Sequence, residues 1–190
     1  MSINLEKGGR INLSKEAPGL KNAGIGLGWD TNATDTGGAF DLDASVFMLG
    51  ATGKISSEKY LVFYNNKESP DTAVIHLGDS TTGEGFGDDE TVTVDLTKVD
   101  PAVEEIVFVV TIHEAESRRQ NFGQVKNAFI RIYDTTTSKE VLKYDLDEDF
   151  SRETAIEFGK LYKKDGEWRF QAVGQGYNSG LQSFVDKYAG

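Results

Sequence analysis

Short runs of β-branched and aromatic residues recur along the chain, separated by clusters of Gly, Asn, Asp, Pro and Ser. Runs bounded in this way are typical of β-strands. In residues 90–96 apolar and polar positions alternate, which predicts a half-buried strand, whereas residues 106–110 are apolar throughout, which predicts a strand covered on both faces. The predicted strands are residues 25–29, 40–49, 60–65, 73–78, 90–96, 105–113, 128–134, 140–146 and 167–175.

The pattern changes near the C-terminus, where two helices are predicted. Residues 151–164 open with Ser151 and Glu153, which suit the first turn of a helix, and carry apolar residues at helical spacing. Residues 178–190 carry an amphipathic stripe made of Leu181, Phe184, Val185 and Tyr188. The sequence therefore predicts a mainly β protein: a β-sandwich of about nine or ten strands with two short helices near the C-terminus. No linker or repeat divides residues 1–190, so a single domain is expected.

Composition narrows the classes of function. The chain has 190 residues, enough for one sizeable core, and no cysteine, which excludes disulfides, thiolate metal sites and thiol chemistry of its own. The first residues lack the basic and apolar regions of a signal peptide, and no apolar run approaches the ~20 residues of a membrane span. A cytoplasmic location is therefore expected.

The charges are unevenly distributed. The net charge is −11, with 31 acidic against 20 basic residues, so nucleic acid is a poor partner. Lys and Arg are absent from residues 22–53 and again from residues 68–97. Solvated acidic surfaces usually mix the two signs, although chance and solubility are an alternative explanation. Two long acidic windows without a base suggest that a cation from outside the chain compensates them.

The second window contains a Gly-rich acidic segment, residues 79–90, that begins with Asp and ends with Glu, as an EF-hand loop does. Its sixth position is Glu84 rather than the required Gly, and strands flank it, so it is not an EF-hand. A calcium loop of another design is possible, because residues such as Gly83 let backbone carbonyls turn inward. A phosphate-binding loop is disfavoured, since no helix follows and the carboxylates would repel the ligand. The acidic residues are Asp79, Glu84, Asp88, Asp89 and Glu90.

The first window carries Asp30, Asp41 and Asp43. Residues i and i+2 of a strand share a face, so Asp41 and Asp43 are expected to point the same way. Such a pair is often only a turn or edge feature, but here a second acidic cluster and the missing bases favour a metal. With no Cys and only His76 and His113, oxygen ligands predominate and favour Ca²⁺ or Mg²⁺ over zinc. Many oxygens on flexible loops favour Ca²⁺ over Mg²⁺, and the pair of acidic windows without bases leads us to expect about two ions.

The sequence supports an enzymatic function less well than it supports metal binding. Paired carboxylates could serve a glycosidase, but such enzymes line their groove with aromatic residues, and Trp29 and Trp168 are the only tryptophans. The run HEAE at residues 113–116 lacks the second histidine of a zinc-protease motif. The mixed charges of residues 116–123, ESRRQNFG, favour a salt-bridged loop over an anion site. We expect no enzymatic activity.

Several segments together resemble the TerD family of bacterial tellurite-resistance and stress proteins. They are KGGRINLSKEAPGLKN, IGLGWD, FDLDASVFMLG, FYNN, GDSTTGEGFGDDE, the long run from IVFVVTIHEAESRRQNFG to AFIRIYD, and AVGQGY. The resemblance spans nearly the whole chain and implies a calcium-binding β-sandwich that acts in the response to tellurite and other chemical or phage stress. The acidic motifs of the family fall on Asp30, Asp41, Asp43, Asn65, Asp79, Asp88, Asp89 and Glu90. Phe86 stands where many relatives have an acid, so a side-chain ligand is not expected there.

The resemblance describes a phenotype rather than a mechanism. We expect a calcium-dependent module that scaffolds other proteins of the same stress system, some of them at the membrane. An alternative is a calcium-dependent lipid or carbohydrate binder similar to C2 domains, for which Phe86 at a loop tip would suit membrane insertion.

Overall fold

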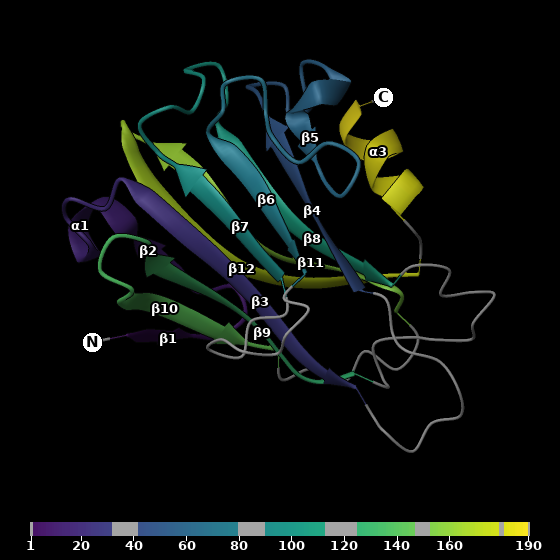
Figure 1. Ribbon diagram of the computed structural model, residues 1–190, viewed down its shortest axis with the longest axis horizontal. Coiled ribbons are helices and arrows are strands. Elements are labelled where there is room, and N and C mark those ends of the chain that lie inside the picture. Colours follow the sequence, from purple (N-terminus) through teal and green to yellow (C-terminus); the bar gives the residue numbers. More distant parts are fainter. Residues whose placement is uncertain are drawn as a thin grey trace.

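The computed structural model describes residues 2–31, 42–79, 90–112, 125–146, 153–178 and 181–189. Two sheets pack face to face as a β-sandwich (Figure 1). Neighbouring strands are antiparallel except β1 and β10, which are parallel. The first sheet, sheet A, has the order β1 (Ile3–Leu5), β10 (Glu140–Asp145), β9 (Val125–Asp134), β3 (Asn22–Thr31), β7 (Glu90–Asp95), β6 (Val74–Asp79). The second, sheet B, has the order β2 (Arg10–Asn12), β12 (Glu167–Tyr177), β11 (Ala155–Lys164), β8 (Glu105–Ile112), β4 (Leu42–Leu49), β5 (Leu61–Val62).

Apolar side chains from the inner faces of both sheets fill the space between them. Sheet A contributes residues such as Ile25, Val92 and Ile130, and sheet B contributes residues such as Phe108 and Phe158, all of them almost fully buried. Burial of this apolar surface is the main force that holds two sheets together. The sandwich core thus fixes the position of every strand end from which the acidic segments leave.

The mainly β sandwich and the two burial patterns are confirmed. In β7 buried and half-buried positions alternate from Glu90 to Asp95, as the alternation of apolar residues predicts. In β8 every residue after Glu105 is buried. Each of the nine predicted strand segments contains a strand, although the segment 60–65 holds only the short β5 and begins with the last residue of the 3₁₀ helix η1 (Glu58–Tyr60).

The outer face of β8 is covered by the C-terminal helix α3 (Leu181–Ala189), which confirms the second predicted helix. Phe184 and Tyr188 of α3 pack against Phe47 on β4, with ring centroids 6.3 and 5.0 Å away. This second apolar cluster also contains Val107 and Val109 of β8. The continuous apolar run of β8 is therefore explained by the sandwich core on one side and α3 on the other.

The helix predicted at residues 151–164 is wrong, because Ala155–Lys164 form strand β11. Between Glu157 and Gly159, β11 has one extra residue relative to β8, which marks a β-bulge, while β12 has one extra residue relative to β11 between Ala172 and Gln175. A bulge adds one residue to a strand, so side chains on one face are locally three positions apart instead of two. Phe158 and Leu161 both lie in the sandwich core for this reason. Their spacing imitates the period of a helix.

Three short elements near the N-terminus were not predicted: β1, β2 and the single-turn helix α1 (Leu13–Glu16). Each strand has three residues, too few to establish an alternating pattern. Asn12 caps α1 by accepting a hydrogen bond from the Lys15 backbone N–H at 3.2 Å. Among the described residues, no helix has the length and apolar character needed to cross a membrane.

Candidate metal centre

We call residues 30–41 and 79–90 the two acidic segments. The strands that flank them meet at one end of the sandwich (Figure 1). In sheet A, Asp79 at the end of β6 is paired with Glu90 at the start of β7. The neighbouring strand β3 pairs Leu27 with Glu90 and ends a few residues later. In sheet B, β4 begins at Leu42, directly after the first acidic segment. The fold therefore brings the boundaries of both segments together.

Glu90 is the best-defined member of this region. Alternation in β7 places it on the inner face together with Val92 and Val94, and only 1% of its surface is exposed. Its Oε2 atom accepts a hydrogen bond from the backbone N–H of Ala44, which belongs to β4 in the opposite sheet. A buried carboxylate is strongly unfavourable unless it is hydrogen-bonded or paired. Glu90 therefore joins the two sheets at the point where the acidic segments leave them.

The buried position of Glu90 decides between the two interpretations of this residue. The backbone of Glu90 is anchored in a strand, as expected, and the alternative of a solvent-exposed residue at the start of a strand is wrong.

His76 is a neighbour of Glu90 that the sequence did not reveal. It lies in β6 with 4% of its surface exposed, and its Nε2 atom is 4.0 Å from Glu90 Oε1. Its backbone N–H donates to the carbonyl of Lys67 at 2.7 Å. The pair follows from the packing of adjacent inward-facing positions on β6 and β7, because His76 is opposite Val92. The only hint in the sequence was that His76 is a polar residue in a predicted strand that is otherwise mostly apolar.

Asp43 lies next to this contact. It is half-buried in β4, directly before Ala44, and is opposite Thr111 of β8. Because the Ala44 backbone N–H donates to Glu90, Asp43 is one residue away from a contact that joins β4 to β7. Asp41, its predicted companion, lies outside the described residues.

Asn65 occupies a different setting. It is exposed in a tight turn that is closed by hydrogen bonds in both directions between the backbones of Phe63 and Asn66, each 3.0 Å long. The side chain of Asn66, rather than that of Asn65, fixes the turn by donating to the carbonyls of Lys59 and Leu61 at 3.0 and 2.8 Å. The chain leaves β5 antiparallel to β4, toward the end at which β4 begins. The turn that carries Asn65 therefore lies on the side of β5 that is nearer to the start of β4.

The remaining predicted ligands are only partly described. Asp30 and Asp79 have defined backbones in β3 and β6, and the register places Asp30 opposite Lys126 of β9. The window without bases in the sequence is therefore next to a lysine position in the sheet. Among the described residues, no three His, Asp or Glu side chains form a cluster able to hold a metal. The predicted ligands Gly83, Glu84, Asp88 and Asp89 lie outside the described residues, as do His113 and the segment 116–123.

What is described fits an oxygen-coordinated ion. Glu90 supplies a carboxylate held rigidly by a backbone hydrogen bond, and Asp43 supplies a second one from the opposite sheet, directly before the Ala44 that donates this bond. Hard cations such as Ca²⁺ take carboxylate and carbonyl oxygens of this kind.

Residues 1–188 match the family model of the TerD domain. The chain belongs to the TerD family. It is 53% identical to "Tellurium resistance protein TerD" of Serratia marcescens over 99% of this chain and 97% of that protein. It is 52% identical to "General stress protein 16U" of Bacillus subtilis over 99% of this chain and 97% of that protein. The membership confirms the resemblance read from the motifs.

Solved structures support the same fold. A crystal structure of a homologue of telluride resistance protein (TerD) from Streptomyces coelicolor is similar with a TM-score of 0.67, at 26% identity over 88% of this chain and 96% of that chain. The names of these TerD relatives describe resistance and stress response, and none of them specifies a catalysed reaction. The chain is therefore a member of a tellurium-resistance and stress-response family.

Proposed function

We propose that this chain is a calcium-binding, non-enzymatic module of a bacterial stress-response system that scaffolds partner proteins in a calcium-dependent way. The TerD relatives and their names support the stress-response setting. The partners we propose are other proteins of the tellurite-resistance system, some of them at the membrane, and we propose that the module works in the cytoplasm. Without cysteine, the chain has no thiol with which to reduce tellurite, so its contribution to resistance is indirect.

The observation that carries the calcium proposal is the bond between Glu90 and the Ala44 backbone across the sandwich. It ties the strand after one acidic segment to the strand after the other. Carboxylates about 4 Å apart repel by about 4 kcal/mol at the effective dielectric of a protein surface, so bringing both segments together requires positive charge. Bound calcium would supply that charge.

Each group of residues then has a role. Glu90 holds a carboxylate on a rigid strand, and Asp43 would provide a second one from the start of β4 in the opposite sheet. Asp30, Asp41, Asn65, Asp79, Asp88 and Asp89 would add further side-chain oxygens. At Gly83 and Glu84 we expect the backbone carbonyls rather than side chains to contribute. This oxygen-rich set suits Ca²⁺ better than Mg²⁺, which requires tight octahedral geometry and retains its waters.

Thermal unfolding with and without calcium tests the proposal. At about 100 times its dissociation constant, one independently bound ion should stabilise the folded state by roughly 2.7 kcal/mol. We therefore expect a clear rise in Tm between excess chelator and millimolar calcium, and a smaller rise with equal magnesium. An unchanged Tm in calcium would contradict the proposal.

A second experiment separates scaffolding from the lipid-binding alternative. If the module acts on proteins, the chain should stay in the supernatant when anionic liposomes are pelleted, whether calcium or chelator is present. Pelleting in calcium alone would favour the C2-like binder instead. The thermal shift is expected in both cases, so the two experiments report on different parts of the proposal.

A further inference from the structure

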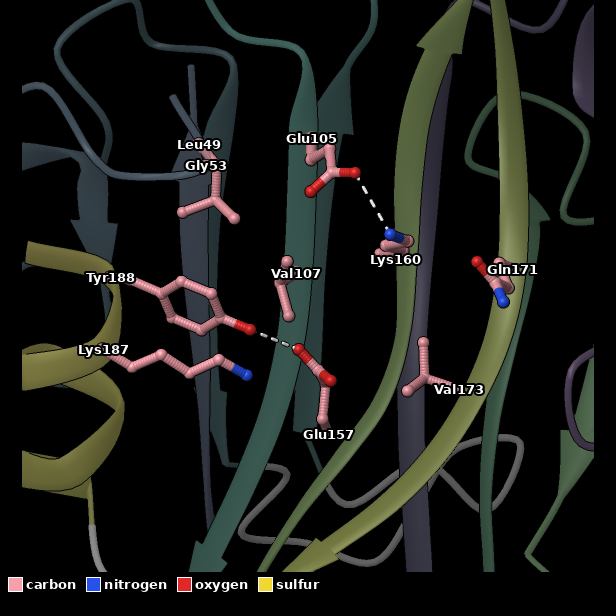
Figure 2. Close-up of a pocket in the computed structure, with 10 residues that line it drawn as sticks. All are labelled: Leu49, Gly53, Glu105, Val107, Glu157, Lys160, Gln171, Val173, Lys187 and Tyr188. Atoms are coloured by element: carbon pink, nitrogen blue, oxygen red, sulfur yellow. Dashed lines mark hydrogen bonds and ion pairs between the residues drawn. The ribbon is translucent and has the colours of Figure 1, made fainter. Parts of the chain in front are cut away.

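A second candidate site lies on the outer face of sheet B, beside α3. There a cavity of about 310 Å³ opens between the strands β8, β11 and β12 and the last turn of the helix (Figure 2). This volume is at the lower end of the range for small-molecule sites. Within the described part of the chain, no predicted calcium ligand is among the residues that line it.

The bulge in β11 creates the polar side of the cavity. Glu157 precedes the register shift against β8, and Lys160 follows it. The extra residue lets both side chains lie on the outer face of the sheet, three positions apart. Figure 2 shows both of them beside the cavity, with Glu157 directed toward the helix.

Glu157 is a buried acid whose second carboxylate oxygen can accept a further hydrogen bond. Only 8% of its surface is exposed, and its Oε1 atom accepts a hydrogen bond of 2.5 Å from the hydroxyl of Tyr188. Burial, together with this bond, raises the pKa of Tyr188 far above that of a free tyrosine, so the phenol stays protonated and remains the donor. The second carboxylate oxygen of Glu157 points away from Tyr188 in Figure 2 and can accept from a bound molecule.

Two lysines supply donors to the same cavity. The Nζ atom of Lys160 is 3.1 Å from Oε1 of Glu105. The Nζ atom of Lys187 donates to the Tyr177 hydroxyl at 3.3 Å and lies over the Tyr188 ring, 5.0 Å from its centroid. An ammonium group has three donors, so each lysine can also bind an anionic oxygen.

The charges limit the ligand. Among the described residues that line the cavity are two carboxylates and two ammonium groups, whose charges cancel. The carboxylates would repel a phosphate, and the ammonium groups would repel a metal cation. A molecule with one positive and one negative group would satisfy both sets. Leu49, Val107 and Val173 add an apolar surface to the same cavity.

We propose that this cavity binds a small zwitterion with an apolar side chain, of the class of free aliphatic amino acids. The ammonium group of the ligand donates to Glu157, and its carboxylate accepts from Lys160. The aliphatic side chain rests against Val107 and Val173. This site is independent of the proposed calcium sites and does not require them.

Titration with L-leucine, followed by NMR chemical shifts of the full chain, tests the proposal. Leucinamide lacks the carboxylate and 4-methylpentanoate lacks the amine, so each should bind about tenfold or more weakly than leucine. Glu157→Gln keeps an oxygen that accepts from Tyr188 but removes the charge, and should abolish the preference for leucine over 4-methylpentanoate. Lys160→Met should reduce the preference for leucine over leucinamide.

Two matched controls exclude general charge effects. Glu104→Gln changes an exposed acid next to Glu105, and Lys164→Met changes an exposed lysine on β11. Both should bind leucine like the unmodified chain. The proposal is overturned if leucine shifts no resonance of the cavity residues up to its solubility limit, or if the two analogues bind as well as leucine. It is also overturned if glucose or inorganic phosphate binds there in preference.

Discussion

Glu90 is the residue on which the proposed calcium site depends most. Glu90→Gln retains an oxygen that can accept from Ala44 N–H, so the fold should persist, but it removes the charge that we assign to the ion. We expect calcium affinity to fall strongly, while unfolding of the calcium-free protein in urea changes by no more than about 1 kcal/mol.

Glu84 provides the matched control within the same acidic segment. Because we assign its backbone carbonyl rather than its carboxylate to the site, Glu84→Gln should change calcium affinity only slightly. Loss of binding in Glu84→Gln together with normal binding in Glu90→Gln would reverse the assignment.

Asp100 offers a residue-scale test of a different network. Its carboxylate accepts hydrogen bonds from the Ala102 backbone N–H at 2.9 Å and from the Tyr60 hydroxyl at 3.0 Å. These two bonds hold the pKa of Asp100 below its usual 3.8. A lowered pKa in the folded state stabilises the protein above the unfolded pKa, and that contribution is lost as the pH falls through the folded value.

Tyr60→Phe removes one of the two bonds and should move the pKa of Asp100 back toward 3.8. The variant should therefore lose less stability than the unmodified chain when the pH is lowered from about 5 to about 3. Urea unfolding at a series of pH values measures this difference. Parallel pH profiles for the two proteins would show that the Tyr60 bond does not act on Asp100.

At the scale of elements, β11 explains the main error of the sequence prediction. Ser151 and Glu153 suit a helix start, and the bulge gives Phe158 and Leu161 a helical spacing. Gly159 argued against this helix, because it would lie in the helix interior, where Gly is unfavourable by about 1 kcal/mol. The bulge itself depends on how β11 packs between β8 and β12, and no local pattern specifies that.

Gly159 is required where the bulge brings β11 close to its neighbour. A Cβ atom at this position would lie 2.5 Å from Cζ of Phe170 and 2.9 Å from the carbonyl oxygen of Gln171. Gly159→Ala should therefore destabilise the protein by about 1–3 kcal/mol, the usual effect of overpacking a core. The measurement is the free energy of unfolding in urea.

A second variant checks the cause. If the clash with the Phe170 ring dominates, Gly159→Ala should be less destabilising in a Phe170→Leu background than alone, which gives a measurable coupling between the two positions. If Gly159→Ala alone changes the free energy of unfolding by less than about 0.5 kcal/mol, the backbone relaxes to accommodate the methyl group and the close approach does not require Gly.

The other elements divide according to how local their signals are. Alternation of apolar and polar residues was sufficient to predict β7, which is covered on one face. A continuous apolar run was sufficient to predict β8, which is covered on both faces. The amphipathic stripe was sufficient for α3. By contrast, the three residues of β1 form a strand only because β10 lies beside them, which is information about tertiary packing.

At the scale of the whole molecule, the sequence predicted the chemistry of the candidate site better than its geometry. It indicated which segments are acidic and lack bases, and that Glu90 begins a strand. It did not indicate that Glu90 crosses to Ala44 in the other sheet, that His76 is its neighbour, or that Lys126 is opposite Asp30. These contacts join strands that are distant in the chain, so they depend on the order of strands in the sheets.

The central claim concerns calcium, and isothermal titration of the chelator-treated protein with CaCl₂ tests it most directly. We expect saturable binding of about two ions per chain, with weaker heats for MgCl₂ at the same concentrations. The acidic segments and the cross-sheet bond of Glu90 would then act as one calcium-organised end of the sandwich. Titration heats no larger than those of dilution, up to millimolar calcium, would contradict the proposed function.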